Sequence, residues 1–147
     1  MKQIRYSRAI VTIEIILGVT FLICGCAIYL FYRSKSLYIY HWCQPLCISE
    51  FIDTCRHSAQ RYPVSDFTRF CLPDGLYCTS YILIIDAIWN KDSRLVKFLI
   101  IYFVPTIVIG SEFMQYFGVI RGTFDMIDLV CYAIPPLVYY IIYKKKP

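Results

Sequence analysis

A group of polar side chains lies at the ends of long apolar runs in the second half of the sequence. Glu112 and Gln115 are three residues apart, and so are Asp125 and Asp128. Residues at this spacing share one face of a helix. Grouped carboxylates can change one another's proton affinity for acid–base chemistry, or they can hold a cation. The candidate site predicted from these types and spacings contains Asp74, Glu112, Gln115, Arg121, Asp125 and Asp128.

Some of these side chains also have a simpler structural explanation. Pro73 and Asp74 fit the first turn of a helix, where proline is favoured and an acid interacts well with the helix dipole. Thr123 is predicted to cap another helix, which would place Asp125 in its first turn. Asp128 lies further inside an apolar run, where acids are costly and usually functional. Two interpretations stay open: a functional site, or polar contacts that hold helices together.

Four apolar segments are predicted to position these side chains. A helix that crosses a membrane needs about 20 mostly apolar residues, with a range of about 17–25. The sequence predicts an all-α membrane protein with one domain and four transmembrane helices. Its predicted spans are residues 9–32, 73–89, 95–117 and 124–143, with a long outer loop, residues 33–72, between helices 1 and 2.

The composition favours the same class of protein. The chain has 147 residues, of which 59% are hydrophobic and 17% charged, and its mean hydropathy is +0.56. Soluble domains contain about 25% charged residues. The net charge of +5 comes in part from basic clusters beside apolar runs, which is typical of orientation signals in membrane proteins. Membrane lipids are therefore the predicted partners, and nucleic acid is not.

Basic residues predict how the segments cross the membrane. They gather at both termini and in the short loop that contains Lys91, Arg94 and Lys97. Because lysine and arginine are enriched in cytoplasmic loops, both termini are predicted to be cytoplasmic. The starts of the second and fourth helices and the end of the third then meet on the outer side. We expect the acids to converge there, with Arg121 as a nearby base that can pair with them.

The loop of residues 33–72 offers a second group of chemically versatile side chains. If the loop lies outside, its cysteines can pair as disulfides. They can also stay free and pack as small hydrophobes. A third possibility is a zinc site, although the spacing matches no standard zinc pattern. The weak metal candidates are His41, Cys43, Cys47, Cys55 and His57. Residues 45–59 also have the pattern of a short amphipathic helix.

Two further acids, Glu14 and Asp86, lie inside apolar segments away from the main group. Asp86 is the more unusual, because apolar residues surround it on a short segment. We expect such an acid to pair with a base or to face a water-filled cavity. The sequence alone identifies no partner for it.

The order of the polar residues resembles that of a known family. Glu112-x-x-Gln115 ends one segment, Arg121 follows in a short loop, and Asp125-x-x-Asp128 opens the next segment. This arrangement resembles the signature of VanZ-like membrane proteins. The stretch "LPDGLY" and Trp89 look like a companion motif of small relatives, so the resemblance covers residues 72–143. The chain departs from the family at Tyr132, where asparagine is frequent, and at Pro135, where glycine is frequent.

The resemblance implies a multi-pass protein of the bacterial inner (plasma) membrane, in the cell envelope. The family's founding association is with low-level resistance to glycopeptide antibiotics, teicoplanin in particular. Together with the predicted cluster, it gives the hypothesis of a polar outer-leaflet site that binds or modifies a lipid-linked or headgroup substrate. The alternatives are a structural or accessory membrane subunit and a small transporter in which Glu14 and Asp86 extend the polar path. Neither a cofactor nor an enzymatic reaction is identified.

Overall fold

The computed structural model describes residues 8–35, 38–43, 45, 47–90 and 93–145. These residues form helices, turns and short connections, and no β-strand occurs among them. The fold is therefore all-α over the described part of the chain, as predicted. The elements are α1 (Arg8–Tyr32), α2 (Tyr38–Cys43), α3 (Ser49–Ala59), the π-helical turn η1 (Phe67–Cys71), α4 (Leu72–Ile88), α5 (Arg94–Tyr116) and α6 (Met126–Lys145).

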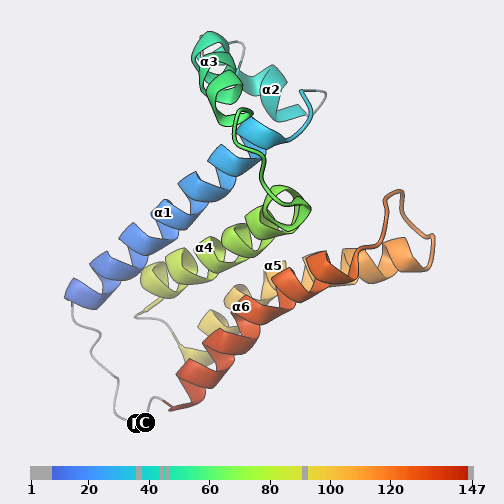
Figure 1. The fold of residues 1–147 in the computed structure, drawn as a ribbon. Helices are drawn as coiled ribbons and strands as arrows, with labels where there is room; N and C mark the ends of the chain where they lie inside the picture. Colours follow the sequence, from blue (N-terminus) through green and yellow to red (C-terminus); the bar gives the residue numbers. More distant parts are fainter. Residues whose placement is uncertain (1–7, 36–37, 44, 46, 91–92, 146–147) are drawn as a thin grey trace.

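The long helices alternate in direction. Figure 1 shows α1 and α4 lying side by side and antiparallel, with α5 and α6 packed beyond α4. At one end of the bundle, α4 and α6 begin and α5 ends, and we call this the site end. The short helices α2 and α3 lie beyond the end of α1 on the same side, and the end of α5 extends outward as an arm (Figure 1). The predicted topology therefore brings the expected helix ends together.

Among the described residues, three helical segments are long and apolar enough to cross a membrane: α1, the continuous segment Phe67–Ile88, and α5. The fourth predicted span corresponds to α6, whose apolar part, Met126–Ile142, is shorter. Residues 33–72, predicted as a loop, instead contain α2, α3 and η1. The amphipathic pattern in residues 45–59 does form a helix, which begins at Ser49.

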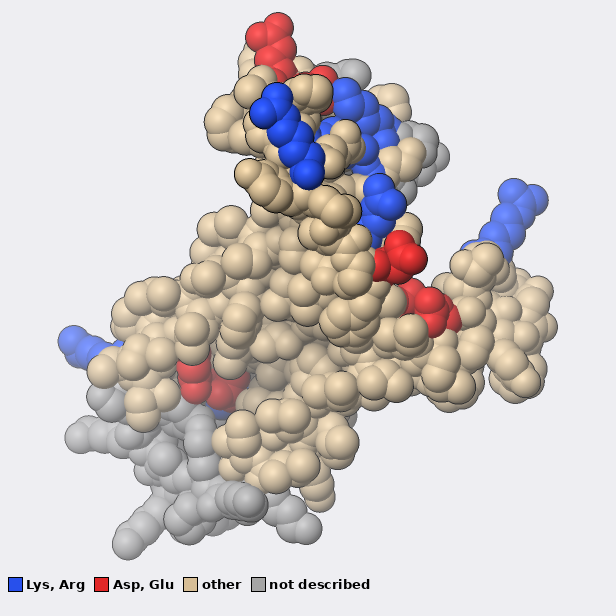
Figure 2. All heavy atoms as spheres, viewed as in Figure 1, with Lys and Arg blue, Asp and Glu red and all other residues tan. Residues whose placement is uncertain are grey.

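Much of the outer surface of these helices is apolar. Ile16 and Ile23 on α1 are 59% and 62% exposed, and Phe103 on α5 and Leu137 on α6 are similarly uncovered. Figure 2 shows charged side chains concentrated over the α2–α3 segment, while the helical body below is mostly uncharged. A continuous apolar surface of this kind needs to be covered by lipid or by another protein.

Two glycines allow α1 to approach α4 closely. Gly18 and Gly25 are the buried residues of α1. A Cβ atom added at Gly18 would lie 2.6 Å from Cγ1 of Ile84, and one at Gly25 would lie 3.0 Å from the Tyr77 ring. Small residues allow such close packing between helices in apolar surroundings.

We expect the Gly18→Ala substitution to destabilise the protein by about 1–3 kcal/mol, because Ile84 would have to leave its packed position. Gly110 is a matched control, since a Cβ atom added there meets nothing within 4 Å. Gly110→Ala should be neutral or stabilising by up to about 1 kcal/mol, because alanine favours a helix. Thermal unfolding of the two variants in detergent measures the difference. Equal shifts would contradict the proposed α1–α4 contact.

The prolines within α5 and α6 do not interrupt these helices. Pro136 cannot donate a backbone hydrogen bond to the carbonyl four residues earlier, which belongs to Tyr132. The Cys78 thiol on α4 donates to this carbonyl instead, at 3.6 Å. Neighbouring helices commonly satisfy such carbonyls in apolar surroundings. The contact also links α4 to α6 near the middle of the bundle.

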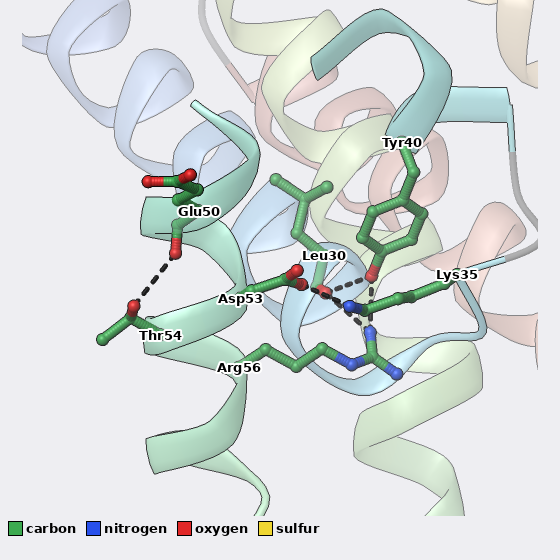
Figure 3. A network of polar contacts seen from close by, with 7 residues as sticks. All are labelled: Leu30, Lys35, Tyr40, Glu50, Asp53, Thr54 and Arg56. Atoms are coloured by element: carbon green, nitrogen blue, oxygen red, sulfur yellow. Dashed lines mark hydrogen bonds and ion pairs between the residues drawn. The ribbon is translucent and has the colours of Figure 1, made fainter. Parts of the chain in front are cut away.

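The α2–α3 segment is attached to the end of α1 by a network of polar contacts (Figure 3). Tyr40 and Arg56 both donate to the Leu30 carbonyl, and Lys35 forms an ion pair with Asp53. Burial raises the pKa of Tyr40 above its ordinary value, so its hydroxyl stays protonated and can donate. These contacts attach α2 and α3 to the end of α1, above the site end (Figure 1).

Candidate functional site

The first part of the site comes from an irregular helical segment. The turn η1 leads directly into α4, and the Leu72 amide donates to the Phe67 carbonyl, five residues earlier. This π-helical turn lies just before the buried Pro73, whose ring would clash with a regular helical carbonyl. As predicted, α4 has Pro73 among its first residues and Asp74 in its first turn. Because η1 precedes α4 directly, the helical segment Phe67–Ile88 is continuous, and this helix start is not a free end.

The second part comes from the end of α5. Gly118 has a φ of 69°, and the Gly118 and Val119 amides donate to the Gln115 and Met114 carbonyls, as in a Schellman motif. This ending holds Glu112 in the last turns of α5, where its side chain is only 7% exposed. Gln115 instead packs against the loop. Its Oε1 atom lies so close to Gly122 that a Cβ atom added to this glycine would be 2.4 Å away.

The third part comes from the start of α6. The Asp125 carboxylate accepts a hydrogen bond from the Ile127 amide at 2.8 Å, and its carbonyl accepts one from the Leu129 amide. Asp125 is therefore the capping residue, and the predicted cap at Thr123 was wrong. Asp128 takes the place in the first helical turn that was predicted for Asp125.

The acids from these three parts converge at the site end. The Asp74 carboxylate lies within hydrogen-bonding reach of the Tyr132 hydroxyl and close enough to Asp128 and Glu112 for their charges to interact. Glu112 in turn interacts with the charges of Asp125 and Asp128 and with the Asp125 backbone amide. The structure thus brings together the four predicted acids, Asp74, Glu112, Asp125 and Asp128. We call this group the acidic cluster.

Two members of the acidic cluster carry buried oxygen atoms that lack hydrogen bonds. Oε2 of Glu112 and Oδ1 of Asp128 are both inaccessible to solvent, and neither has a hydrogen-bond partner among the described residues. Leaving a buried polar atom unpaired is costly, and more so for a charged group. These two oxygens are therefore the atoms of the cluster for which a bound cation or a proton would supply the missing partner.

The predicted base, Arg121, does not join the cluster. Arg121 is exposed on the loop between α5 and α6, and no ion pair connects it to the acids of the described chain. Arg33, at the end of α1, is the base whose charge reaches Asp74. It donates to the Phe70 carbonyl at 3.1 Å and lies over the Tyr29 and Phe70 rings. The positive charge that interacts with the cluster thus comes from Arg33, directly after α1.

The weak metal candidates of the α2–α3 segment do not form a metal-binding group in the structure. Cys43 is buried, whereas His41, Cys47 and His57 are exposed. All eight cysteines of the chain are free thiols, so the structure contains no disulfide. Within the described residues, the ligand atoms that lie close enough to share a metal ion belong instead to Cys71, Asp125 and Asp128.

Asp86 has the partner that the sequence did not identify. It forms an ion pair with Lys97 of α5 and accepts a hydrogen bond from the Tyr139 hydroxyl of α6 at 2.7 Å. Asp86 and Lys97 are 3% and 5% exposed. Lys97 is therefore a buried helical residue and not part of the short loop to which its charge was assigned. This pair connects three helices at the opposite end of the bundle from the acidic cluster.

The sequence did not identify Cys71 and Arg33 as neighbours of the acidic cluster. Cys71 was grouped with the loop cysteines, although it stands three residues before Asp74. In a helix that continues through Pro73, this spacing would have placed both side chains on one face. Arg33 follows directly after the first predicted span, and its position in the sequence does not indicate that it lies near Asp74.

Over the part of the chain that the structure describes, the fold is all-helical, with three helices long and apolar enough to cross a membrane and an acidic cluster at one end of the bundle. Comparisons with protein families, with curated proteins and with solved structures found no match for this chain.

Proposed function

We propose that the chain is a multi-pass protein of the bacterial cell envelope whose acidic cluster binds or modifies the polar headgroup of a lipid or lipid-linked substrate. The observation that carries this proposal is the state of Glu112. Its carboxylate is buried, and one oxygen has no hydrogen-bond partner among the described residues. Membrane proteins seldom keep such an acid without a function.

The surroundings of the cluster favour a substrate from the membrane surface. The arm formed by the end of α5 and the following loop carries exposed apolar residues, with Phe117 73% and Val119 66% exposed. The Tyr116 ring packs against the Phe117 and Phe124 rings at centroid distances of 5.3 and 5.2 Å. Aromatic residues of this kind prefer the level of the lipid headgroups. An arm at that level would hold the acidic cluster beside them.

The proposal includes α6 as a fourth span. Its apolar part is short, but α6 packs against both α4 and α5 and runs antiparallel to α5 (Figure 1). A helix held in this way is covered on one side by protein and needs lipid only on the other. The order of Glu112, Gln115, Arg121, Asp125 and Asp128 also supports a VanZ-like identity, and through it a role in tolerance of teicoplanin.

Two alternatives are less well supported by the geometry. If the acids only held helices together, their oxygens should have partners. Asp86 is an example, since its carboxylate is bound by Lys97 and by the Tyr139 hydroxyl. Glu112 and Asp128 instead carry unpaired oxygens. A transporter would need Asp86 on an open polar path, but this residue is buried and bound on two sides.

Expression of the chain in a teicoplanin-susceptible bacterium tests the proposal. We expect the wild-type protein to raise tolerance, and we expect Glu112→Gln and Asp128→Asn each to return it to the level of an empty vector. Acid–base groups of this kind typically contribute a factor of about 10²–10⁴ to a reaction rate. Membrane abundance, measured by immunoblot, should not change.

Asp66→Asn is the matched control, because Asp66 is an exposed acid just before η1. It should leave tolerance unchanged. Full tolerance in both the Glu112 and the Asp128 variants would show that the cluster is not the functional site.

A further inference from the structure

The acidic cluster includes a group of atoms with the arrangement of metal ligands. The thiol sulfur of Cys71 and one carboxylate oxygen each from Asp125 and Asp128 lie within 4.8 Å of one another. Ligand atoms bound at about 2.0–2.3 Å to one tetrahedral zinc ion lie about 3.3–3.8 Å apart. The three side chains would therefore have to close by up to about 1.5 Å to bind one ion.

Glu112 independently points to a cation at this place. Glu112 is only 7% exposed, its Oε2 atom has no hydrogen-bond partner in the described chain, and the carboxylate interacts with the Asp125 backbone amide. The carboxylate is thus directed at the residues that supply the ligand atoms. Oδ1 of Asp128 is buried and unpaired as well. A bound cation would compensate these desolvated negative charges, which are otherwise costly.

The local charge balance also favours a cation. The acidic cluster contains four carboxylates, Asp74, Glu112, Asp125 and Asp128, whose charges interact with one another. Arg33 reaches Asp74, but its guanidinium already donates to the Phe70 carbonyl. One partly engaged arginine does not balance the cluster, and a divalent ion would offset part of the remaining negative charge.

The donor set restricts the class of metal. Calcium and magnesium take oxygen ligands, and a cysteine ligand is not expected for either. Zinc and related transition metals accept sulfur and oxygen together, and a coordinated thiol loses its proton. Three protein ligands with one position left open are typical of catalytic zinc sites.

We propose that Cys71, Asp125 and Asp128 bind a divalent transition metal of the zinc class, with Glu112 beside the open position. Only the role of the metal rests on the proposed function: the ion would polarise a headgroup oxygen or phosphate. The binding itself is independent of any activity and can be measured on the purified chain.

The experiment uses the full-length protein, purified in detergent, incubated with Zn²⁺ and then desalted. Elemental analysis is expected to find about one zinc per wild-type chain and less than about a fifth of that in Cys71→Ala and in Asp128→Asn, as for loss of one of three ligands. Replacing Zn²⁺ with Co²⁺ should give a thiolate-to-metal charge-transfer band that the Cys71 variant lacks. Circular dichroism verifies the helical fold of each variant.

Cys78→Ser is the matched control, because Cys78 is a buried thiol on the same helix and serine keeps a donor for the Tyr132 carbonyl. It should retain both the zinc and the cobalt band. Wild-type protein without zinc, or a Cys71→Ala variant that keeps zinc and the band, would overturn the inference. If the protein binds no zinc, the metal inference fails, but the tolerance assay still tests the proposed function. If zinc binds and Glu112→Gln does not change tolerance, the proposed function fails and the metal inference stands.

Discussion

The Lys97→Ala variant is expected to lose about 3–5 kcal/mol of folding stability, the largest effect of any single substitution considered for this chain. The substitution removes the positive partner of Asp86 and leaves a buried carboxylate between three helices. The Tyr139 hydroxyl would remain as its hydrogen-bond donor. One neutral donor does not replace a charge in an apolar environment. Thermal unfolding in detergent, followed by circular dichroism, measures the loss.

The ion pair between Lys35 and Asp53 provides the matched control. Its side chains are 57% and 51% exposed, compared with 7% and 5% for Lys97 and Asp86. Exposed pairs contribute less than about 1 kcal/mol, so Lys35→Ala should change the unfolding temperature little. The double variant Asp86→Leu/Lys97→Met should recover most of the loss, because apolar residues of similar size often replace a buried pair without cost. A Lys97→Ala variant as stable as Lys35→Ala would show that the buried pair is not formed.

The long helices were predictable because their signal is spread over many residues. Apolar runs near membrane length determine α1, α4 and α5 almost completely, and their bounds lie close to the predicted ones. The α2–α3 segment was harder to predict from the sequence, since its structure depends on individual contacts such as those of Arg56 with Leu30 and Tyr40. The π-helical turn before Pro73 was missed because proline marks a helix start by composition, while here the preceding turn widens to accommodate it.

The acidic cluster was predictable in part for the same reason. Helical spacing and antiparallel topology are enough to bring Glu112 and Asp128 to one end of the bundle. The basic partners of these acids were harder to predict, because the contacts of a long basic side chain depend on which helices lie beside it in the folded protein. Arg121 is close in sequence yet exposed, whereas Arg33 is distant in sequence and acts on Asp74. Lys97 was counted with the loop charges although it lies within the predicted span 95–117, because its burial depends on its pairing with Asp86 of α4.

Neutral replacements in the acidic cluster are expected to change stability in the opposite direction to those at Asp86. In metal-free protein, Glu112→Gln and Asp128→Asn should each raise the free energy of unfolding by about 1–3 kcal/mol, because each removes a buried charge whose oxygen has no partner. Asp86→Asn should lower it, since this side chain loses the charge of Lys97. Residues kept for function often reduce stability in this way.

Added Zn²⁺ should then reverse the order of stability between the wild-type protein and Asp128→Asn. A ligand present at 100 times its dissociation constant stabilises a folded protein by about 2.7 kcal/mol. We expect this gain for the wild-type protein and for Asp86→Asn, which keeps the acidic cluster, but not for Asp128→Asn, which lacks a ligand. Thermal unfolding with EDTA and with Zn²⁺ measures both effects on the same samples. If Glu112→Gln and Asp128→Asn are destabilised in EDTA as Asp86→Asn is, the cluster acids hold helices together and the site hypothesis fails, because only partnered carboxylates stabilise a fold when charged.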